Sequence, residues 1–384
     1  MVTKRLISFI IFIACLSASY AQSYISKTVQ YDGETRHFDM YVPAIYDGVS
    51  QVPLIFNFHG GGGDIASQIG IADMSPIADT ANFIVVYPQA LPDPNDGGST
   101  NWIHKDPTTV DDVFFIDALI DLLSVDYQID ASRIYACGYS LGGEFTYELS
   151  CRLNFKIAAI GVVARTMQTW TLDDCSPMHP TGILTILGTE DPISDYNGVW
   201  WAGVQYYLSA DEVHNYWVSY NNCETTPIVS PIPNVNTSDG STVERYSWSN
   251  ASNCVYVEHL KVIGGGHDWP GSFGNMDINA TEEIWQFVSQ YDLEGLMECT
   301  TTPTNEINSS QMNFSVYPNP LYGQLAIERD FSDIQEFKIY SILGELVLTG
   351  RLDAEINTID LSSLPPNTYF LNIEKHSIKV IKIE

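Results

Sequence analysis

The amino-acid sequence alternates short apolar runs with amphipathic segments over most of its length. Apolar runs of strand length lie near residues 53, 84, 134, 158, 184 and 256. Between them, Val110–Asp126 places apolar residues at the spacing of one buried helical face, and Thr281–Tyr291 predicts a closing helix. A hairpin around Asp32-Gly33 is expected to precede them. This order predicts an α/β domain with a mostly parallel sheet and helices on both faces.

The pattern changes near residue 299. Residues 299–312 are rich in Thr, Ser, Asn and Pro, a composition typical of a linker between an enzyme-sized domain at 22–298 and a smaller one at 313–384. Short strand-like runs separated by turns predict that the smaller domain is an all-β sandwich. These runs are Asn313–Val316, Gly323–Glu328, Phe337–Ile342, Glu345–Leu348, Thr368–Ile373 and Ser377–Ile383.

The first 21 residues have the layout of a secretory signal peptide. Lys4-Arg5 precedes an apolar stretch, Leu6–Ala18, and small residues lead to a cleavage site after Ala21. The stretch is too short for a membrane span, and no other segment is apolar enough. We therefore expect an exported chain with no membrane span.

Net charge and motif content exclude several functions. The formal charge of −30 opposes binding to nucleic acid or to an anionic membrane by Coulomb repulsion. The sequence contains no P-loop, no H-E-x-x-H motif and no cysteine–histidine zinc spacing, so no metal or other cofactor is predicted.

A candidate nucleophile lies at Ser140. Gly138-Tyr139-Ser140-Leu141-Gly142 matches the G-x-S-x-G nucleophile elbow, with a strand-like run before it and a helix-compatible run after it. Such a turn exposes the serine hydroxyl and places the amide of Leu141 at a helix N-terminus, where it can stabilise an oxyanion. The local pattern therefore predicts acyl-transfer chemistry.

A serine nucleophile needs a base, and an acid that orients the base. Asp191 follows a buried strand, and His267 lies in a glycine-rich loop after a later strand, which is the chain order of an α/β-hydrolase. Glu190, Asp195 and Asp268 are the alternatives to Asp191 as the acid.

A second oxyanion donor is expected from His59-Gly60-Gly61-Gly62-Gly63, which follows an early strand and matches the HGGG-type motif of esterases. Gly61 is the first candidate, with Gly60 and Gly62 as alternatives. His59 precedes the nucleophile and is expected to have a structural role.

Residues 26–291 resemble the polyhydroxybutyrate depolymerase and feruloyl or acetylxylan esterase group, often classed as carbohydrate esterase family one. The matching segments are Pro53–Gly63, Val110–Val113, Gly138–Gly143, Gly188–Pro192 and Gly264–Gly271. The resemblance implies an α/β-hydrolase fold and a metal-independent serine esterase whose catalytic residues are Ser140, Asp191 and His267. The sequence departs from the group at Glu144 and at two aromatic pairs, Trp200-Trp201 and Tyr206-Tyr207.

The expected substrate is an ester of a plant polysaccharide, with feruloyl or acetyl as the acyl group. A polyhydroxyalkanoate or another polyester is the alternative, and a catalytically silent binding protein with the same fold is a third reading. Trp102 and Trp269 are expected to border the cleft, where flat rings suit phenolic acids and sugars, unless they are core residues.

Six cysteines remain after the predicted signal peptide, and six cysteines allow fifteen full pairings. The family resemblance suggests a disulfide between Cys151 and Cys175 and another between Cys223 and Cys254. Cys137 is expected to be a buried free thiol, with a disulfide to the distant Cys299 as the alternative, so the state of Cys299 is left open.

The C-terminal segment resembles the type IX secretion sorting domain of Bacteroidetes. The resemblance rests on Tyr317-Pro318-Asn319-Pro320, Leu343-Gly344, Leu361–Tyr369 and a basic C-terminus. It implies that the type IX machinery is a partner and that the protein is released outside the cell or held at the cell surface after crossing the outer membrane. A carbohydrate-binding β-module is the alternative.

Overall fold

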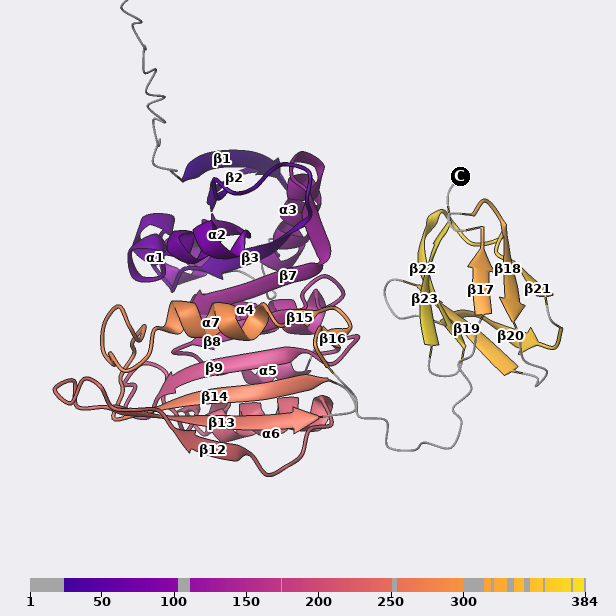
Figure 1. The fold of residues 1–384 in the computed structure, drawn as a ribbon. Coiled ribbons are helices and arrows are strands. Elements are labelled where there is room, and N and C mark those ends of the chain that lie inside the picture. The colour runs from indigo at the N-terminus through magenta and orange to yellow at the C-terminus, as the bar shows by residue number, and fades with distance from the viewer. Residues whose placement is uncertain are drawn as a thin grey trace, which may run out of the picture. The chain divides into compact units, whose positions relative to one another are not determined.

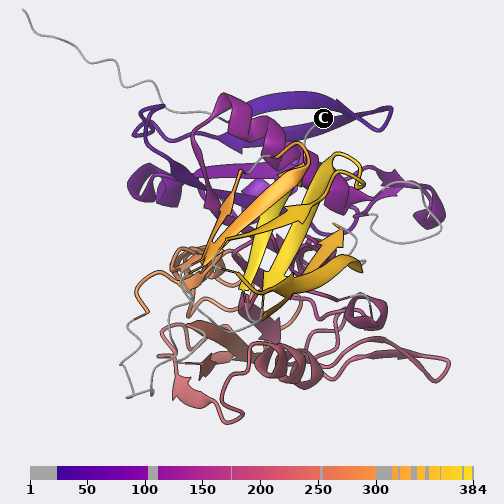
Figure 2. The same cartoon turned by 90° about the vertical axis from the view of Figure 1, so that its right-hand side faces the viewer.

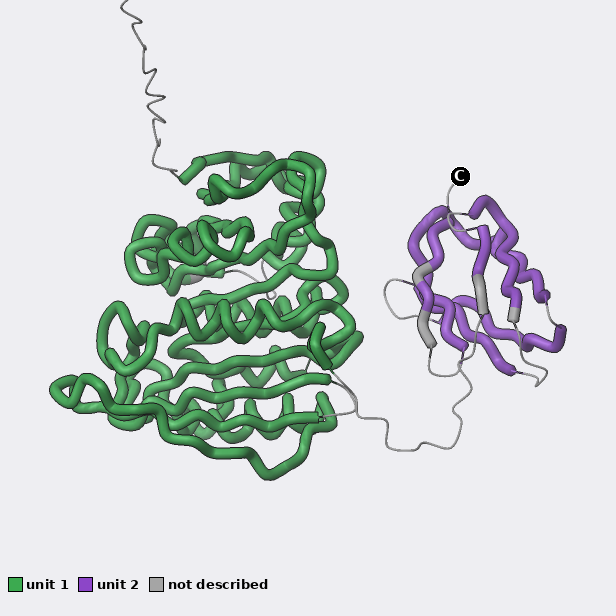
Figure 3. Tube along the Cα trace, viewed as in Figure 1, with its two compact units in different colours: residues 1–301 green, residues 302–384 purple. Residues whose placement is uncertain are grey.

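The chain divides into two compact units, residues 1–301 and 302–384 (Figure 3). The division lies within the predicted linker. The structure, a computed structural model, describes residues 24–102, 111–173, 175–250, 254–299, 314–318, 321–329, 335–341, 346–354, 356–373 and 376–382. The predicted signal peptide, at 1–21, lies outside the described residues.

The first unit is built on a ten-stranded sheet with the order β1-β2-β4-β3-β7-β8-β9-β14-β13-β12 (Figure 1). From β4 to β14 all neighbouring strands pair in parallel, and both edges are antiparallel. The mostly parallel sheet is therefore confirmed, while the edge strands β12 and β13 were not predicted. The strands are β1 Ile25–Tyr31, β2 Glu34–Tyr41, β3 Val52–Phe58, β4 Ile84–Pro88, β7 Ile129–Tyr139, β8 Ala159–Val163, β9 Gly182–Gly188, β12 Ile228–Pro231, β13 Thr242–Asn250 and β14 Val255–Ile263.

Helices cover both faces of this sheet (Figures 1 and 2). Successive residues of β8 show the two faces: a Cβ on Gly161 would meet Ile284 of α7, whereas Val162 contacts the position of Gly143 in α4. Neighbouring strand residues point to opposite faces, so α4 and α7 lie on opposite sides. The helices are α1 Ile65–Ile71, α2 Ser75–Ala81, α3 Asp112–Asp126, α4 Leu141–Arg152, α5 Thr169–Asp173, α6 Ala210–Tyr220 and α7 Ala280–Val288.

The central strands are mostly apolar because both of their faces are covered. All residues of β3, β4, β8 and β9 are buried, as expected for parallel strands between two helical layers. The β1–β2 hairpin turns at Asp32 and Gly33, whose φ angles of 50° and 81° suit a tight two-residue turn. Short elements outside the main sheet are β5 Pro92–Asp93, η1 Pro94–Asp96, β6 Ser99–Thr100, β10 Val199–Trp201, β11 Val204–Tyr207, β15 Tyr291–Asp292 and β16 Gly295–Leu296.

The second unit is a small β sandwich, as predicted. One sheet has the order β17-β18-β21 and the other β20-β19-β22-β23. Leu325, Ile327 and Ile359 of the first sheet share one buried cluster with Ile339 and Leu371 of the second. The strands are β17 Phe314–Tyr317, β18 Gln324–Arg329, β19 Gln335–Ser341, β20 Leu346–Leu352, β21 Ile356–Asp360, β22 Asn367–Ile373 and β23 His376–Lys382; β21 was not predicted.

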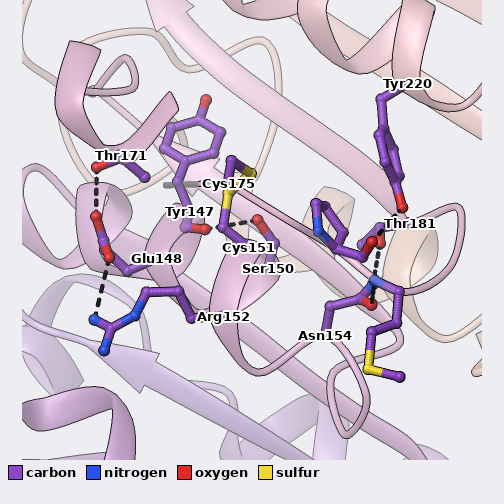
Figure 4. Close-up of a disulfide and its surroundings, with 12 residues drawn as sticks. Tyr147, Glu148, Ser150, Cys151, Arg152, Asn154, Thr171, Cys175, Thr181 and Tyr220 are labelled. Atoms are coloured by element: carbon purple, nitrogen blue, oxygen red, sulfur yellow. Dashed lines mark hydrogen bonds and ion pairs between the residues drawn. A yellow bond between two sulfur atoms is a disulfide. The ribbon is translucent and has the colours of Figure 1, made fainter. Parts of the chain in front are cut away.

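One suggested disulfide is present and the other is wrong. Cys151 is bonded to Cys175, as suggested (Figure 4). Cys254, however, is bonded to Cys299, and Cys223 is a buried free thiol whose Sγ lies 3.9 Å from Val255 O. The β15–β16 hairpin brings the end of the unit to Cys254, because Leu296 N–H donates to Cys254 O at 2.8 Å. That tertiary contact, invisible in the sequence, decides the partner.

Across the described ranges, no helix has both the length and the apolar composition needed to cross a bilayer.

Candidate active site

Ser140 occupies a strained turn between β7 and α4. Its φ of 53° and ψ of −122° lie outside the regions that most residues adopt. A Cβ on Gly138 would lie 2.4 Å from Gly142 C and O, and a Cβ on Gly142 would lie 2.3 Å from Phe58 O. Both glycines are thus required because the turn packs backbone against backbone. This strand–turn–helix geometry agrees with the predicted nucleophile elbow.

The structure brings together the three residues predicted as nucleophile, base and acid. His267 Nε2 lies 2.9 Å from Ser140 Oγ, and His267 Nδ1 lies 2.7 Å from Asp191 Oδ2. An ionised carboxylate only accepts hydrogen bonds, so the proton of the neutral ring is on Nδ1 and Nε2 accepts from the serine hydroxyl. The imidazole is therefore oriented to take a proton from Ser140.

Asp191 is fixed by its own loop. Its Oδ1 accepts hydrogen bonds from the amides of Ile193 and Ser194, both at 2.8 Å, which leaves Oδ2 for the imidazole. The carboxylate side chain is only 2% exposed. The alternatives are engaged elsewhere or exposed: Asp268 Oδ2 accepts from Gly266 N–H, Asp195 accepts from Asn197 N–H, and Glu190 is exposed.

A buried hydrogen-bond chain joins the loop of Asp191 to the sheet. The Tyr196 hydroxyl lies 2.9 Å from His259 Nε2, and Thr185 Oγ1 lies 2.9 Å from His259 Nδ1 and 2.8 Å from His214 Nε2. Burial lowers the pKa of His214 to about 3, and burial beside His214 holds the pKa of His259 well below its ordinary value. Both rings are therefore neutral in the folded protein.

Tyr139 positions the loop of His267. Its hydroxyl donates to His267 O at 2.7 Å, and the two rings lie 5.1 Å apart. Burial, with a contribution from the carboxylates of Asp191 and Asp268, raises the pKa of Tyr139 to about 12, so the hydroxyl keeps its proton. Tyr139 occupies a variable position of the G-x-S-x-G motif, and nothing in the neighbouring sequence indicates the partner of its hydroxyl.

The glycine loop after β3 borders the serine. A Cβ on Gly60 would lie 3.3 Å from Ser140 Cβ, and a Cβ on Gly61 would lie 2.6 Å from Leu141 Cδ1. The Gly62 amide donates to Thr100 O at 2.8 Å, which removes Gly62 from the oxyanion candidates. The close approach of Gly61 to the Leu141 side chain makes these two residues neighbours in the structure. Their role as oxyanion donors stays a prediction.

His59 holds this loop in place. Ala90 N–H donates to His59 Nε2 at 3.1 Å, so the ring proton is on Nδ1, which donates to Gly60 O at 2.7 Å. Burial lowers the pKa of His59. The contacts agree with the expected structural role.

The two tryptophans expected to border the cleft are core residues instead. Trp102 is 4% exposed, donates from Nε1 to His59 O at 2.8 Å and stacks on Phe145 of α4 with ring centres 4.9 Å apart. Trp269 is fully buried, and its Nε1 donates to Thr281 Oγ1 at 3.0 Å. The substrate-binding prediction for these rings is wrong because each polar edge found a partner inside the fold.

A buried charged group beside the nucleophile was only partly anticipated. Glu144, noted as a departure from the esterase group, is 2% exposed, and Arg165 Nη2 lies 3.3 Å from its Oε2. The Tyr207 hydroxyl donates to the same Oε2 at 2.8 Å. The sequence identifies Glu144 as unusual because the esterase group rarely has an acidic residue there. Its partners, Arg165 and Tyr207, lie far along the chain, and nothing in the sequence near Glu144 indicates them.

In the part of the chain that the structure describes, no group of three or more His, Cys, Asp or Glu side chains is arranged to hold a metal ion.

Comparison with known proteins gives two separate results. Residues 315–383 match the family described as "Secretion system C-terminal sorting domain". The first unit is similar to a bifunctional acetylxylan esterase/xylanase of Neocallimastix patriciarum, with 27% identity over 279 residues covering 71% of this chain and 37% of the relative. Feruloyl esterase B of Piromyces equi is 27% identical over 258 residues, covering 65% of this chain and 44% of the relative.

The chain spans less than half the length of these two relatives. Among solved structures, an acetyl xylan esterase from Aspergillus awamori matches with a TM-score of 0.51 and 15% identity, over 69% of this chain and 99% of that one. This likeness confirms the α/β-hydrolase fold. The chain is thus similar to acetylxylan and feruloyl esterases in its first unit and carries a secretion sorting domain in its second.

Proposed function

We propose that the protein is an exported serine carboxylic-ester hydrolase that removes acetyl or feruloyl groups from plant polysaccharide. The observation that supports this most is the hydrogen-bonded series Asp191–His267–Ser140, with distances of 2.7 and 2.9 Å. Relatives whose names include acetylxylan esterase and feruloyl esterase support the class of substrate.

The reaction proceeds through an acyl-enzyme. Ser140 Oγ attacks the ester carbonyl while His267 Nε2 takes the hydroxyl proton, and Asp191 stabilises the imidazolium that forms. The amides of Gly61 and Leu141 donate to the oxyanion of the tetrahedral intermediate. His267 then returns the proton to the alcohol that leaves, which is a sugar hydroxyl, and water releases the acid by the same steps in reverse.

The direct test uses purified wild-type and Ser140→Ala proteins with p-nitrophenyl acetate and a fluorophosphonate probe. Wild type should hydrolyse the ester and become labelled, whereas Ser140→Ala should do neither while keeping its melting temperature. Turnover of Ser140→Ala at the wild-type rate would refute the assignment of the nucleophile. A wild-type protein with neither turnover nor label would support the catalytically silent reading. A panel of acetylated xylan, feruloylated arabinoxylan and polyhydroxybutyrate then ranks the substrates.

The second unit supports export by a sorting route. Residues 315–383 match a secretion sorting domain, and the type IX machinery is its expected partner. Deleting residues 313–384 in a Bacteroidetes host should retain active enzyme in the periplasm, and release of the truncated protein into the medium would contradict the proposal. Loss of activity on insoluble polysaccharide alone would instead identify a binding module.

A further inference from the structure

A hairpin of two short strands carries exposed aromatic side chains. Here the aromatic arm is residues 199–207, comprising β10 and β11, with Ala202 and Gly203 at the turn at φ angles of 49° and 81°. Trp200 is 59% exposed and Trp201 is 73% exposed. Large aromatic side chains usually lose most of their exposure on folding, so two adjacent exposed tryptophans indicate a surface that meets something other than water.

The hairpin carries its apolar groups in two neighbouring places. Trp201 pairs with Val204 across the strands, so these two side chains lie on the same face. The register shifts between Val199 and Trp200, and Tyr206 is the extra residue at this shift. The Tyr206 ring, which is 36% exposed, meets the ring of Trp170 of α5 edge-on at 6.0 Å. The result is a partly exposed aromatic surface rather than a single exposed ring.

The base of the aromatic arm is attached to the helix that begins at the candidate nucleophile. The Tyr207 hydroxyl donates to Glu144 at 2.8 Å and accepts from Gln168 Nε2 at 2.8 Å, and the Arg165 guanidinium lies 3.8 Å above the Tyr207 ring. The Glu144 amide in turn donates to Ser140 O at 3.0 Å. One helical turn, about 5.4 Å, therefore separates the anchor of the arm from the serine.

Two more contacts hold α5 and Cys175, which follows it, against α4. Thr171 Oγ1 donates to Glu148 Oε1 at 2.5 Å, and the disulfide joins Cys151 to Cys175 (Figure 4). Thr169 Oγ1 donates to Gln205 O at 3.2 Å, which connects α5 to the arm. The aromatic arm is thus tied to the helix of the nucleophile directly and through α5.

We propose that the aromatic arm binds neutral sugar rings of the polysaccharide that carries the ester. This inference rests on the proposed function. Flat aromatic faces stack well on the C–H faces of sugar rings, and the formal charge of −30 disfavours an anionic polymer. An ester carried by a polysaccharide must place its acyl group at Ser140 while the sugar chain remains on the protein surface around the active site. The arm, which is anchored one turn away, is the surface on which those sugars lie.

Binding is tested without turnover, in the Ser140→Ala protein, by affinity electrophoresis in gels that contain neutral, ester-free arabinoxylan. Trp200→Ala/Trp201→Ala in that background should raise the Kd at least tenfold. Phe155→Ala, which removes an aromatic ring that is 43% exposed outside the arm, is the matched control and should bind as the parent does. An unchanged Kd in the double variant overturns the proposal.

Kinetics and solution size give the second test. With Ser140 restored, the double variant should lower the ratio of kcat/KM on feruloylated arabinoxylan to kcat/KM on p-nitrophenyl acetate at least tenfold, mainly through KM. Equal losses on both esters with a lower melting temperature would make the arm structural and overturn the proposal. A wild-type dimer that the double variant converts to a monomer in light scattering would assign the arm to a subunit interface, which also overturns it.

The two proposals fail separately. A wild-type protein inactive on every ester but retarded by arabinoxylan, with the retardation lost in the double variant, refutes the esterase function and keeps the sugar-binding arm. An active enzyme whose double variant binds arabinoxylan normally refutes only the arm.

Discussion

Gly142→Ala tests whether close backbone packing sets the geometry of the site. A Cβ at this position would lie 2.3 Å from Phe58 O and 2.6 Å from His59 O, and a real Cβ essentially never comes within 3.0 Å of another atom. Neither oxygen belongs to a side chain that could rotate away. The start of α4 and the end of β3 must therefore separate by nearly 1 Å, because the contact of 2.3 Å has to open to at least 3.0 Å.

That separation changes both halves of the site at once. Ser140 precedes α4, and the glycine loop with the predicted oxyanion donor Gly61 follows β3. A misplacement of roughly 1 Å costs about 10²-fold in rate, and overpacking of this kind costs about 1–3 kcal/mol of stability. We expect kcat on p-nitrophenyl acetate to fall about 10²-fold and the melting temperature to fall with it.

The assay compares kcat and KM with thermal unfolding followed by circular dichroism. Gly70→Ala is the matched control, because Gly70 lies in α1 and a Cβ there would have nothing within 4 Å. It should leave kcat unchanged and stabilise the protein by up to about 1 kcal/mol, since alanine favours a helix. If Gly142→Ala kept wild-type kcat and melting temperature, the close-packing argument would be refuted.

Three further predictions follow from the described contacts. Asp191→Asn should lower kcat about 10⁴-fold with little change in melting temperature, because it favours the wrong imidazole tautomer; a loss under tenfold would contradict the assigned role. His214 and His259 stay neutral when folded but take up protons when unfolded, so urea unfolding should show stability falling by about 1.4 kcal/mol per pH unit for each histidine below roughly pH 6.5. His214→Gln should flatten this slope, and an equal slope in the variant would disprove the cause. Replacing both Cys151 and Cys175 by serine, which opens a loop with a sequence separation of 24, should cost about 3 kcal/mol; a reductant that destabilises wild type and this variant equally would show that another disulfide dominates.

Local sequence patterns were sufficient to predict the order of the strands and helices and the nucleophile elbow at Ser140. A strand, a tight turn and a helix are encoded within a few neighbouring residues, and the glycines at 138 and 142 reflect a steric demand that a short segment imposes on itself. The parallel sheet followed from the alternation of apolar runs and helices. The antiparallel edge strands β12 and β13 did not, because their exposed positions weaken the apolar signal: every residue of β12 is exposed.

Contacts between distant segments were decided only by the tertiary structure. The sequence by itself identified Ser140, Asp191 and His267 through motif and chain order. His267 is 76 positions from Asp191 and 127 positions from Ser140, and only the packed sheet brings it within 2.7 Å of the first and 2.9 Å of the second. Trp102 and Trp269 are expected from the sequence to border the cleft, and yet both are buried. A side chain is buried or exposed according to what packs above it, and that depends on elements far along the chain.

Tertiary contacts also decide the cysteine pairs and the position of the aromatic arm. Cys151 and Cys175 are joined as the family resemblance suggested, whereas the partner of Cys254 is Cys299, which the β15–β16 hairpin delivers. The aromatic pairs at 200–201 and 206–207 are visible as a departure from the esterase group, but the hydrogen bond from Tyr207 to Glu144, one helical turn after Ser140, is not. Composition and spacing therefore identify the chemical groups, and the summed packing of the whole domain decides which of them meet.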